Sequence, residues 1–440
     1  MHSTSQADGT LFPVGLLPST ATVGDQGLEV GAVPVAVLAA EFGTPLLVYD
    51  EVHLRERCQQ AKAAFPDGVS YASKAFLCRS LARLIHDEGL GLDVASGGEL
   101  AVALAAGVPA SRLTLHGNNK SPSELKAALD AGVGRIVIDS CDEVDRLETL
   151  TAGGTNWQRV LLRVNPAVTA DTHQSMRTGH AASKFGVAVS GGQAGEITSQ
   201  LHRSRHLRLE GIHVHAGSQI LDLEPLGRSI SAAAAFAKSC DAAELIVGGG
   251  LGVAYTHGQQ APSLAEWGSV AHRAARAAGF DGRLHAEPGR AIVAVAAITV
   301  YTIGTIKTLS EDVTVLAVDG GISDNPRPAL YGSVYQPLLA RYPYVRDGVQ
   351  RGPFTVVGKN CESSDTFARD VEVLAQPRIG DTLCLPVTGA YSYAMSSNYN
   401  GLARPAVVLV GEGQTRVIIR RESFDDLIRA DLFLAPEGMS

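Results

Sequence analysis

The chain has 440 residues, 45% of them hydrophobic, which suffices for two or three domains or for one barrel with an additional domain. A net charge of -8 argues against a nucleic-acid-binding protein, and no apolar run is long enough to span a bilayer. The N-terminus lacks the regions of a secretory signal, and the six cysteines form no CxxC pair. The sequence therefore predicts a soluble, cytoplasmic, enzyme-sized protein without a disulfide framework or a zinc knuckle.

A βα rhythm runs from about residue 68 to residue 290, where short apolar runs alternate with helix-like segments. In one of these helices Ser121 is the expected N-cap, Glu124 completes a capping box and Gly132 ends the helix. Eight parallel strands with helices between them predict a (β/α)8 barrel, and an open doubly wound sheet is the alternative. The expected strands are residues 69–74, 90–96, 112–117, 135–140, 159–165, 209–217, 244–250 and 283–290.

The rhythm changes after about residue 295, where strand-like runs follow one another with few helical patterns between them. These runs predict a second, mainly β domain, and residues 27–35 could add a strand to it. The expected organisation is an N-terminal segment at 1–45 that joins the β domain, a barrel at 46–308 and the β domain at 309–440.

Polar and ionisable residues stand where the expected barrel strands end. Active sites of (β/α)8 barrels lie at the C-terminal ends of the strands, so these positions are candidates for function. They are Lys74, Asp93, His116, His215, the glycines at 248–250, and Glu287.

Lys74 ends the first expected strand, in the stretch YASKA. One interpretation is an ordinary lysine with its amine in solvent, because lysines are mostly exposed. The other is a Schiff-base lysine whose amine is made nucleophilic by a partly desolvated site. Such a lysine needs a carbonyl partner. Pyridoxal phosphate supplies one, and requires in addition a phosphate-binding loop, a partner for its ring nitrogen and a group that stacks on the ring.

The last two expected strands end in residues that suit such a cofactor. Three consecutive glycines at 248–250 would let backbone N–H groups approach a phosphate, although glycines also form ordinary turns. The stretch is not the GxGxxG fingerprint, which sets a dinucleotide aside. Glu287 could keep a pyridine nitrogen protonated, and Arg290 could bind a phosphate or a carboxylate. An ion pair within the loop is the alternative.

His213 and His215 alternate along one expected strand, so both side chains could face the barrel interior. A metal pair is one interpretation. However, two ligands are too few for zinc, and no carboxylate-plus-histidine set is found to complete the site, so no metal is predicted. In the other interpretation one imidazole stacks on a cofactor ring while Ser218 binds its phosphate. For His213 a satisfied core histidine is the preferred interpretation.

Three stretches after the barrel carry further polar residues. In GKNCESSD, Cys361 lies beside Glu362 and near Asp365 in a polar turn, where it is better placed to donate a proton than a buried thiol would be. An arginine suits a carboxylate through its two-pronged donor geometry. The stretches DNPRPALYG and TGAYSYAMSSNYN contain Arg327, Tyr331 and Tyr391.

Taken in order, these stretches resemble the pyridoxal-phosphate decarboxylases of the alanine-racemase-like fold, and most closely the diaminopimelate decarboxylase family. The match covers nearly the whole chain, and so many motifs in one order are specific although each is modest alone. The motifs are LFPVGLLPSTATV, GTPLLVYDE, YASKA, HGNNKS, SKFGV, HVHAGSQ, GGGLGVAY, EPGR, DNPRPALYG, CESSD, TGAYSYAMSSNYN, ARPAVVLV and RRESFDDLI.

The resemblance implies a role for each candidate residue. Lys74 would form the Schiff base with pyridoxal phosphate, His215 would stack on the ring, and Glu287 would pair with the ring nitrogen. Cys361 would return a proton to the product carbanion. The phosphate would be held or flanked by Ser218, Gly249, Gly250, Arg290 and Tyr391, and the substrate would contact Arg290, Arg327, Tyr331, Glu362 and Tyr391.

The resemblance also implies a homodimer in which the CESSD stretch of one subunit completes the active site of the other. The implied activity is decarboxylation of meso-2,6-diaminopimelate to L-lysine, because the zwitterionic far end of that substrate suits Arg327 together with Glu362. Decarboxylases of D-configured, diamino or carrier-bound amino acids share much of the scaffold. A noncatalytic cofactor carrier and a metal-dependent barrel hydrolase are more distant alternatives.

One departure from the family pattern is Ser364, which stands where the family commonly has glycine. Glycine tolerates the positive φ that serine resists. We therefore expect the turn, and with it the fine position of the substrate, to differ slightly from the family.

Overall fold

The computed structural model describes residues 10–11, 15–154, 157–166, 183–310, 313–341, 345–346, 353–373 and 376–433. Its contacts divide the chain into two units, each of which is described separately. The barrel unit comprises Glu51–Ala296 and Gly389–Ala394, and the β unit comprises Met1–Asp50, Ala297–Thr388 and Met395–Ser440.

Eight parallel strands form the sheet of the barrel unit, in a spatial order that follows the chain from β6 to β14, with the short β11 paired only with β10. The ring is nearly closed, because a parallel bridge joins Val69 to Ala286, whose amide donates to the Gly68 carbonyl oxygen (3.2 Å). Sequential order and closure confirm the (β/α)8 barrel and exclude the open doubly wound sheet. The strands are β6 (Ser70–Ala72), β7 (Gly91–Val94), β8 (Leu113–Leu115), β9 (Arg135–Ile138), β10 (Gln158–Asn165), β11 (Val187–Ala188), β12 (Leu207–Val214), β13 (Glu244–Gly248) and β14 (Arg283–Glu287).

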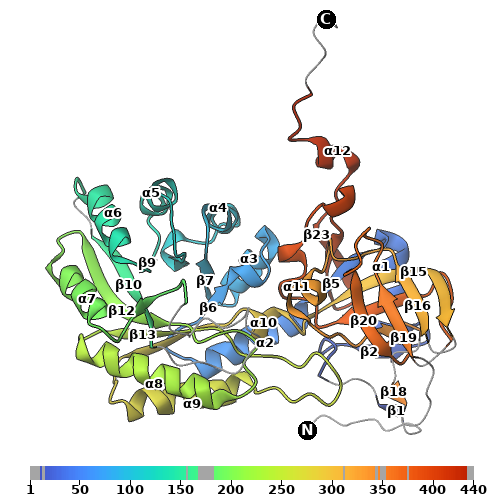
Figure 1. Cartoon of the computed structure of the whole chain (residues 1–440), viewed down its shortest axis with the longest axis horizontal. Helices are drawn as coiled ribbons and strands as arrows, with labels where there is room; N and C mark the ends of the chain where they lie inside the picture. Colours follow the sequence, from blue (N-terminus) through green and yellow to red (C-terminus); the bar gives the residue numbers. More distant parts are fainter. Residues whose placement is uncertain are drawn as a thin grey trace, which may run out of the picture. The chain divides into compact units, whose positions relative to one another are not determined.

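The helices of the barrel unit lie around the outside of its strands (Figure 1). Local sequence sets their ends: the predicted capping box is formed by Ser121 and Glu124, and Gly132 ends the helix in the left-handed conformation (φ 74°). Ser263 and Glu266 form a second capping box. The helices are α2 (Glu51–Ala64), α3 (Arg79–Asp87), α4 (Gly97–Ala105), α5 (Pro122–Ala131), α6 (Cys141–Thr151), α7 (Gln193–Arg203), α8 (Leu223–Ser239), α9 (Leu264–Ala277) and α10 (Arg290–Val293).

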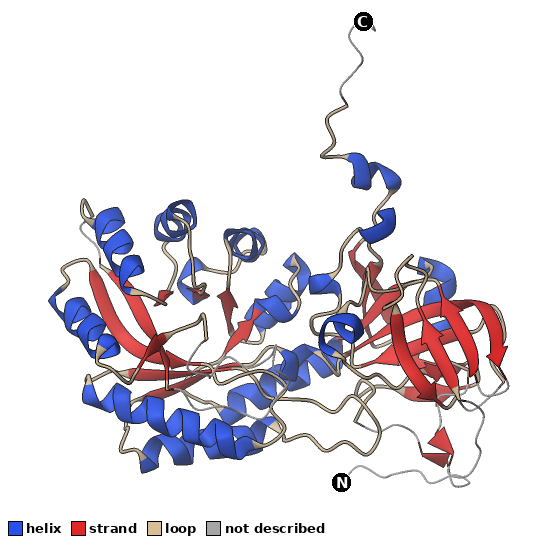
Figure 2. Cartoon of the chain, in the orientation of Figure 1, coloured by secondary structure: helices blue, strands red, loops and turns tan. Residues whose placement is uncertain are grey.

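The β unit is built on a mixed sheet in the order β20-β19-β16-β15-β5-β22-β23, with β21 on β15 and β17 on β21. The strands are drawn in red in Figure 2. A separate three-stranded sheet holds β2, β3 and β4, and β1 pairs with β18. These strands are β1 (Thr10–Leu11), β2 (Thr22–Gly24), β3 (Gly27–Val30), β4 (Val33–Pro34), β5 (Leu46–Asp50), β15 (Ala297–Ser310), β16 (Val313–Val318), β17 (Leu338–Leu339), β18 (Val345–Arg346), β19 (Phe354–Val357), β20 (Thr366–Val371), β21 (Thr382–Pro386), β22 (Ala406–Gly411) and β23 (Gln414–Ile419).

Three short helices complete the described part of the β unit: α1 (Val35–Phe42), α11 (Arg327–Tyr331) and α12 (Phe424–Ile428). No helix in the described ranges is long and apolar enough to cross a membrane.

The limits of the two units differ from the expected domain limits at 45 and 308. β5 and β15 pair with each other, with Ile298 opposite Val48, and both residues are buried in the core of the β unit. An apolar strand pattern predicts a strand but does not say which of two sheets the strand joins. The units therefore change at Asp50 and at Ala297.

Candidate active site

Lys74 lies in a short 3-10 turn, Ser73–Ala75, directly after β6 at the C-terminal end of the barrel. Its side chain is exposed although Ser73 and Ala75 on either side are buried. Burial raises the pKa of the carboxyl groups of Asp93 and Glu99, and Lys74 is among the nearby charges that oppose this rise. The amine therefore stands within electrostatic reach of the barrel interior.

Glu287 ends β14 and is buried, with 4% of its surface exposed. Its two oxygens each meet an imidazole Nε2: Oε1 lies 3.0 Å from His116, and Oε2 lies 3.0 Å from His213. Burial would raise the pKa of Glu287, but the two histidines hold it well below its ordinary value. Glu287 is thus an anionic acceptor held by two hydrogen bonds, which suits a protonated pyridine nitrogen.

The pKa values of the two histidines are shifted in opposite directions. Burial lowers the pKa of His213 to about 4, so this imidazole is neutral at pH 7. Burial also acts to lower the pKa of His116, but Asp93, whose Oδ1 lies 3.7 Å from Nε2, and Glu287 together raise it. Sequence reasoning gave neither histidine a role beside Glu287, because the contacts join β8, β12 and β14. Their only signal in the sequence was a position at or near a strand end.

His116, His213 and Glu287 also form a group whose possible metal-binding atoms lie within 4.8 Å of one another. The sequence revealed no carboxylate-plus-histidine set around His213, whereas the structure places Glu287 and His116 beside it. Residues far apart in the sequence meet at one end of a barrel, and spacing along the chain does not reveal such a set. In this structure the short contacts within the group are hydrogen bonds, which account for its arrangement without an ion.

His215 follows β12 and is partly exposed. Burial of its ring, together with the charges of Lys74 and Arg163, lowers its pKa well below the ordinary value. Gly248 leaves room for the ring, because a Cβ there would lie 2.7 Å from Nδ1 of His215. A neutral, planar imidazole in this place is suited to stack on an aromatic ring.

Arg290, the first residue of α10, is a buried cation with 6% of its surface exposed. It donates to Tyr255 Oη (2.5 Å) and to Ser218 Oγ (3.0 Å), and its Nε has no hydrogen-bond partner. Among the described residues no acid forms an ion pair with it. A buried guanidinium surrounded by hydroxyl groups and lacking a counter-ion is a site for an anion.

The glycine loop lies directly beside Ser218. The Ile220 amide donates to the Gly250 carbonyl oxygen (2.9 Å), and the Gly252 amide donates back to Ile220 (2.9 Å). A Cβ at Gly249 would lie 2.4 Å from the Glu287 carbonyl oxygen, and one at Gly250 (φ +107) would lie 2.4 Å from that of Gly217. Only glycine allows this close backbone approach, so the loop and Arg290 together fit a phosphate group.

Tyr391 comes from the short segment Gly389–Ala394 that belongs to the barrel unit. Its ring lies 4.8 Å from the Arg290 guanidinium carbon, and its amide donates to the Ala75 carbonyl oxygen (2.8 Å). This one residue therefore joins the turn that carries Lys74 to the predicted phosphate site. Its backbone takes the left-handed conformation (φ 61), which non-glycine residues seldom adopt.

The predicted residues of the β unit lie on two loops and a short helix. Arg327 begins α11 and is buried; its Nε donates to Tyr335 Oη (3.0 Å), and its guanidinium carbon lies 6.0 Å from the Tyr331 ring centre. Cys361 and Glu362 are exposed. Asp365, which was predicted to lie near the thiol in a polar turn, is buried, and its carboxylate accepts hydrogen bonds from backbone amides.

Ser364 does not adopt positive φ, so the turn does not require glycine at this position. Its amide (3.2 Å) and its Oγ (3.3 Å) both donate to Glu362 Oε1. Backbone and side-chain hydrogen bonds from Ser364 and Ser363 lower the pKa of Glu362. The serine thus adds a donor to a residue expected to contact substrate.

The barrel with a lysine, a buried acid and a glycine loop at its C-terminal end is the arrangement of a pyridoxal-phosphate enzyme of the alanine-racemase-like decarboxylase fold. Comparison with known proteins agrees. Residues 51–294 match the family "Pyridoxal-dependent decarboxylase, pyridoxal binding domain". The diaminopimelate decarboxylase of Actinosynnema pretiosum is 43% identical, with 95% of this chain and 99% of that protein covered.

Solved structures give the same relationship. The diaminopimelate decarboxylase of M. jannaschii, in complex with L-lysine, has a TM-score of 0.87 and 28% identity over 94% of this chain and 98% of its own. The Helicobacter pylori enzyme, also with L-lysine, has a TM-score of 0.83 and 30% identity over 90% and 98%. The chain belongs to the diaminopimelate decarboxylase family.

Proposed function

We propose that this protein removes carbon dioxide from meso-2,6-diaminopimelate and releases L-lysine. The observation that carries the proposal is the arrangement at the barrel mouth. There the buried Arg290 with no acid partner, the glycine loop and Glu287 lie at the same end as the exposed amine of Lys74. The relatives described above are named for this reaction, and two were crystallised with L-lysine.

Each group of the barrel unit has a place in this chemistry. Pyridoxal phosphate, when bound, supplies an aldehyde for amines and a cationic ring that accepts the electron pair left by carbon dioxide. Lys74 would supply the amine that binds this aldehyde. Glu287, kept anionic by its two histidines, would accept a hydrogen bond from the ring N–H, and His215 would stack on the ring. Ser218, Gly249, Gly250, Arg290 and Tyr391 hold or flank the phosphate.

The β unit supplies the groups for substrate recognition and proton return. We propose that Arg327 with Tyr331 and Glu362 recognises the zwitterionic far end of the substrate, with Arg290 and Tyr391 also in contact with it. Cys361 Sγ gives a proton to Cα after carbon dioxide has left. The exposure of Cys361 and Glu362 in the single chain is consistent with their acting in a second copy.

We further propose a homodimer that works in the cytoplasm. In this arrangement each subunit lends Cys361 and Glu362 to the other, so a monomer would lack the proton donor. All six cysteines are free in the structure, which agrees with a reducing compartment.

A substrate panel tests the proposal. The purified protein, loaded with pyridoxal phosphate, is assayed for carbon dioxide release from meso-diaminopimelate, L-ornithine, L-lysine and D-amino acids. We expect release from meso-diaminopimelate at a kcat/KM at least ~100-fold above the others, because a missing carboxylate leaves buried donors unpaired. If carbon dioxide were released only from another amino acid, that amino acid would be the substrate instead. If the cofactor-loaded protein released carbon dioxide from none of them, it would be a noncatalytic carrier.

A further inference from the structure

Asp365 is a buried carboxylate, 4% exposed, that no basic side chain in the described part of the chain neutralises. Both of its oxygens accept backbone N–H groups: Oδ1 accepts from Ile322 (2.8 Å), and Oδ2 accepts from Asn360 (2.8 Å). The two amides belong to different loops of the β unit, after β16 and after β19. One carboxylate therefore fastens two loops together.

The two loops are shaped around this carboxylate. A Cβ at Gly321 would lie 2.5 Å from Asp365 Oδ2, and one at Gly358 would lie 2.3 Å from the same oxygen. The loops are also joined beside it, because Ser323 Oγ donates to Asn360 Oδ1 (3.2 Å). Glycine at both positions leaves room for the acid, so the sequence of each loop accommodates the same group.

Each loop carries residues that the proposed function uses. Residues 358–365 hold Cys361 and Glu362, and residues 319–327 lead directly to Arg327. The amide of Cys361 is held from the other side by Asn400 Oδ1 (2.7 Å). The loop that bears the thiol is therefore fixed at both its middle and its end.

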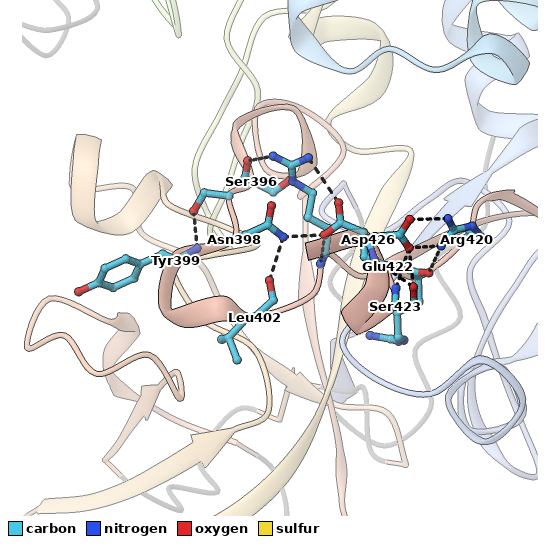
Figure 3. Close-up of polar contacts among 11 residues, drawn as sticks. Ser396, Asn398, Tyr399, Leu402, Arg420, Glu422, Ser423 and Asp426 are labelled. Atoms are coloured by element: carbon cyan, nitrogen blue, oxygen red, sulfur yellow. Dashed lines mark hydrogen bonds and ion pairs between the residues drawn. The ribbon is translucent and has the colours of Figure 1, made fainter. Parts of the chain in front are cut away.

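The segment that contains Asn400 is itself anchored, as Figure 3 shows for its neighbours. Asn398 Nδ2 donates to Glu422 Oε2 (2.6 Å) and to the Leu402 carbonyl oxygen (3.0 Å). Glu422 Oε2 also accepts from the Arg404 amide (2.9 Å). Asn400 thus supports the thiol loop at Cys361, and Asp365 joins that loop to the loop that leads to Arg327.

We propose that Asp365 is a positioning residue that fixes the loop bearing the proton donor Cys361, which each subunit lends to the other, by holding that loop on the neighbouring loop 319–327 through one ionised carboxylate. This inference rests on the proposed function and extends it to a residue that touches neither cofactor nor substrate. Only the ionised form offers two acceptor oxygens, since a protonated carboxyl group turns one of them into a donor. A shift of a catalytic group by about 1 Å can cost roughly 100-fold in rate.

Protonation of Asp365 has opposite effects on stability and on activity. Burial raises its pKa to about 6, with a smaller contribution from Glu362. Burial likewise raises the pKa of Asp324, on the other loop, to about 7. Because the pKa of Asp365 is above the ordinary 3.8, the contribution of this residue to stability is full below about pH 4 and is lost as pH rises through 6. Activity should instead appear as pH rises through 6, when the second acceptor forms.

The test compares Asp365→Asn with Asp381→Asn, which removes an acid of the same unit that pairs with Arg341 (2.8 Å). We expect Asp365→Asn to lower kcat 10- to 100-fold, to change KM for meso-diaminopimelate less than about threefold, and to lose the rise in kcat near pH 6. Asp381→Asn should keep the kcat and the pH profile of the unmodified chain. An Asp365→Asn variant with unchanged kcat, or with lowered kcat and an unchanged acid limb, would overturn the proposal.

The rate at which Cys361 is alkylated reports on the position of its loop in the absence of substrate. Iodoacetamide labelling, followed by peptide mass spectrometry, compares Cys361 with the exposed Cys141 of the barrel unit as an internal reference. In Asp365→Asn we expect the Cys361 rate to change at least ~3-fold while the Cys141 rate stays the same. If the unmodified chain released no carbon dioxide, the proposed function would be wrong. If the Cys361 alkylation rate were unchanged in Asp365→Asn, only the positioning role of Asp365 would be wrong.

Discussion

Two buried charges, one at each end of the barrel, differ in whether they have partners of opposite charge. At the N-terminal end Glu244 is fully buried, and it is paired with Arg135 (2.8 Å), Arg283 (3.4 Å) and His285 (3.0 Å). At the C-terminal end Arg290 is buried with no acid partner among the described residues. Glu244 is thus neutralised by its neighbours, whereas Arg290 leaves a place for an anionic ligand.

This difference separates stability from function within one sheet. A paired buried acid contributes to the fold as long as its partners remain, and removing one partner is costly. An unpaired buried cation costs stability in the free chain and is compensated only when an anion binds. Substitutions at the two ends should therefore change different properties of the protein.

The largest effect on activity is expected for Lys74→Ala. The exposed side chain makes no hydrogen bond or ion pair within the described residues, so the fold should be retained. Turnover should fall at least ~1000-fold, because no other amine replaces the lost nucleophile. Borohydride reduction followed by peptide mass spectrometry should find the cofactor attached at Lys74 in the unmodified chain and absent in the variant. Lys126→Ala, which removes an exposed lysine paired with Asp130, should change neither result.

Much of this arrangement follows from the sequence alone, because its causes are local. The eight strands, the capped helix after Ser121 and the polar strand ends all have short-range patterns. The partners of Glu287 do not, because His116 and His213 meet it only once three distant strands stand side by side. For the same reason the sequence did not show that Asp365, close to Cys361 in the chain, accepts hydrogen bonds from backbone amides of two loops.

Glu287→Gln tests the C-terminal end of the barrel with a side chain of nearly the same size, so that only the charge of the residue is lost. The amide keeps the shape of the side chain but cannot hold a ring nitrogen in its protonated form, so kcat should fall roughly 100-fold. Because Glu287 helps to raise the pKa of His116, that pKa should fall in the variant. Steady-state carbon dioxide release and an NMR titration of the histidine would measure both. A kcat within threefold of that of the unmodified chain would show that Glu287 does not take part in the reaction. Glu224→Gln, a substitution of an exposed glutamate, is the control.

Glu244→Gln probes the N-terminal end, where the comparison predicts a loss of stability without a loss of activity. Arg135 and His285 would each lose an acidic partner, so the free energy of unfolding should fall by about 3 kcal/mol. The pKa of Glu244 is lowered to about 2: burial acts to raise it, but His285 and Arg135 outweigh this. Its contribution is therefore full above about pH 4.5 and is lost as pH falls towards 2. Urea unfolding at pH 7 and pH 3 would measure this, and a tenfold lower kcat would contradict the separation of the two ends.

The smallest effect is expected for Ser364→Gly, which restores the residue common in the family. The Ser364 amide donor to Glu362 Oε1 remains and only the Oγ donor at 3.3 Å is lost, on an exposed turn that does not need positive φ. Because an exposed hydrogen bond competes with water, kcat/KM for meso-diaminopimelate should change about twofold. Ser363→Gly, which removes the Oγ donor at 3.2 Å to the same oxygen, is the matched variant and should behave alike. A change above tenfold in Ser364→Gly alone would mean that this serine sets substrate choice, since the backbone of the turn is the same in both.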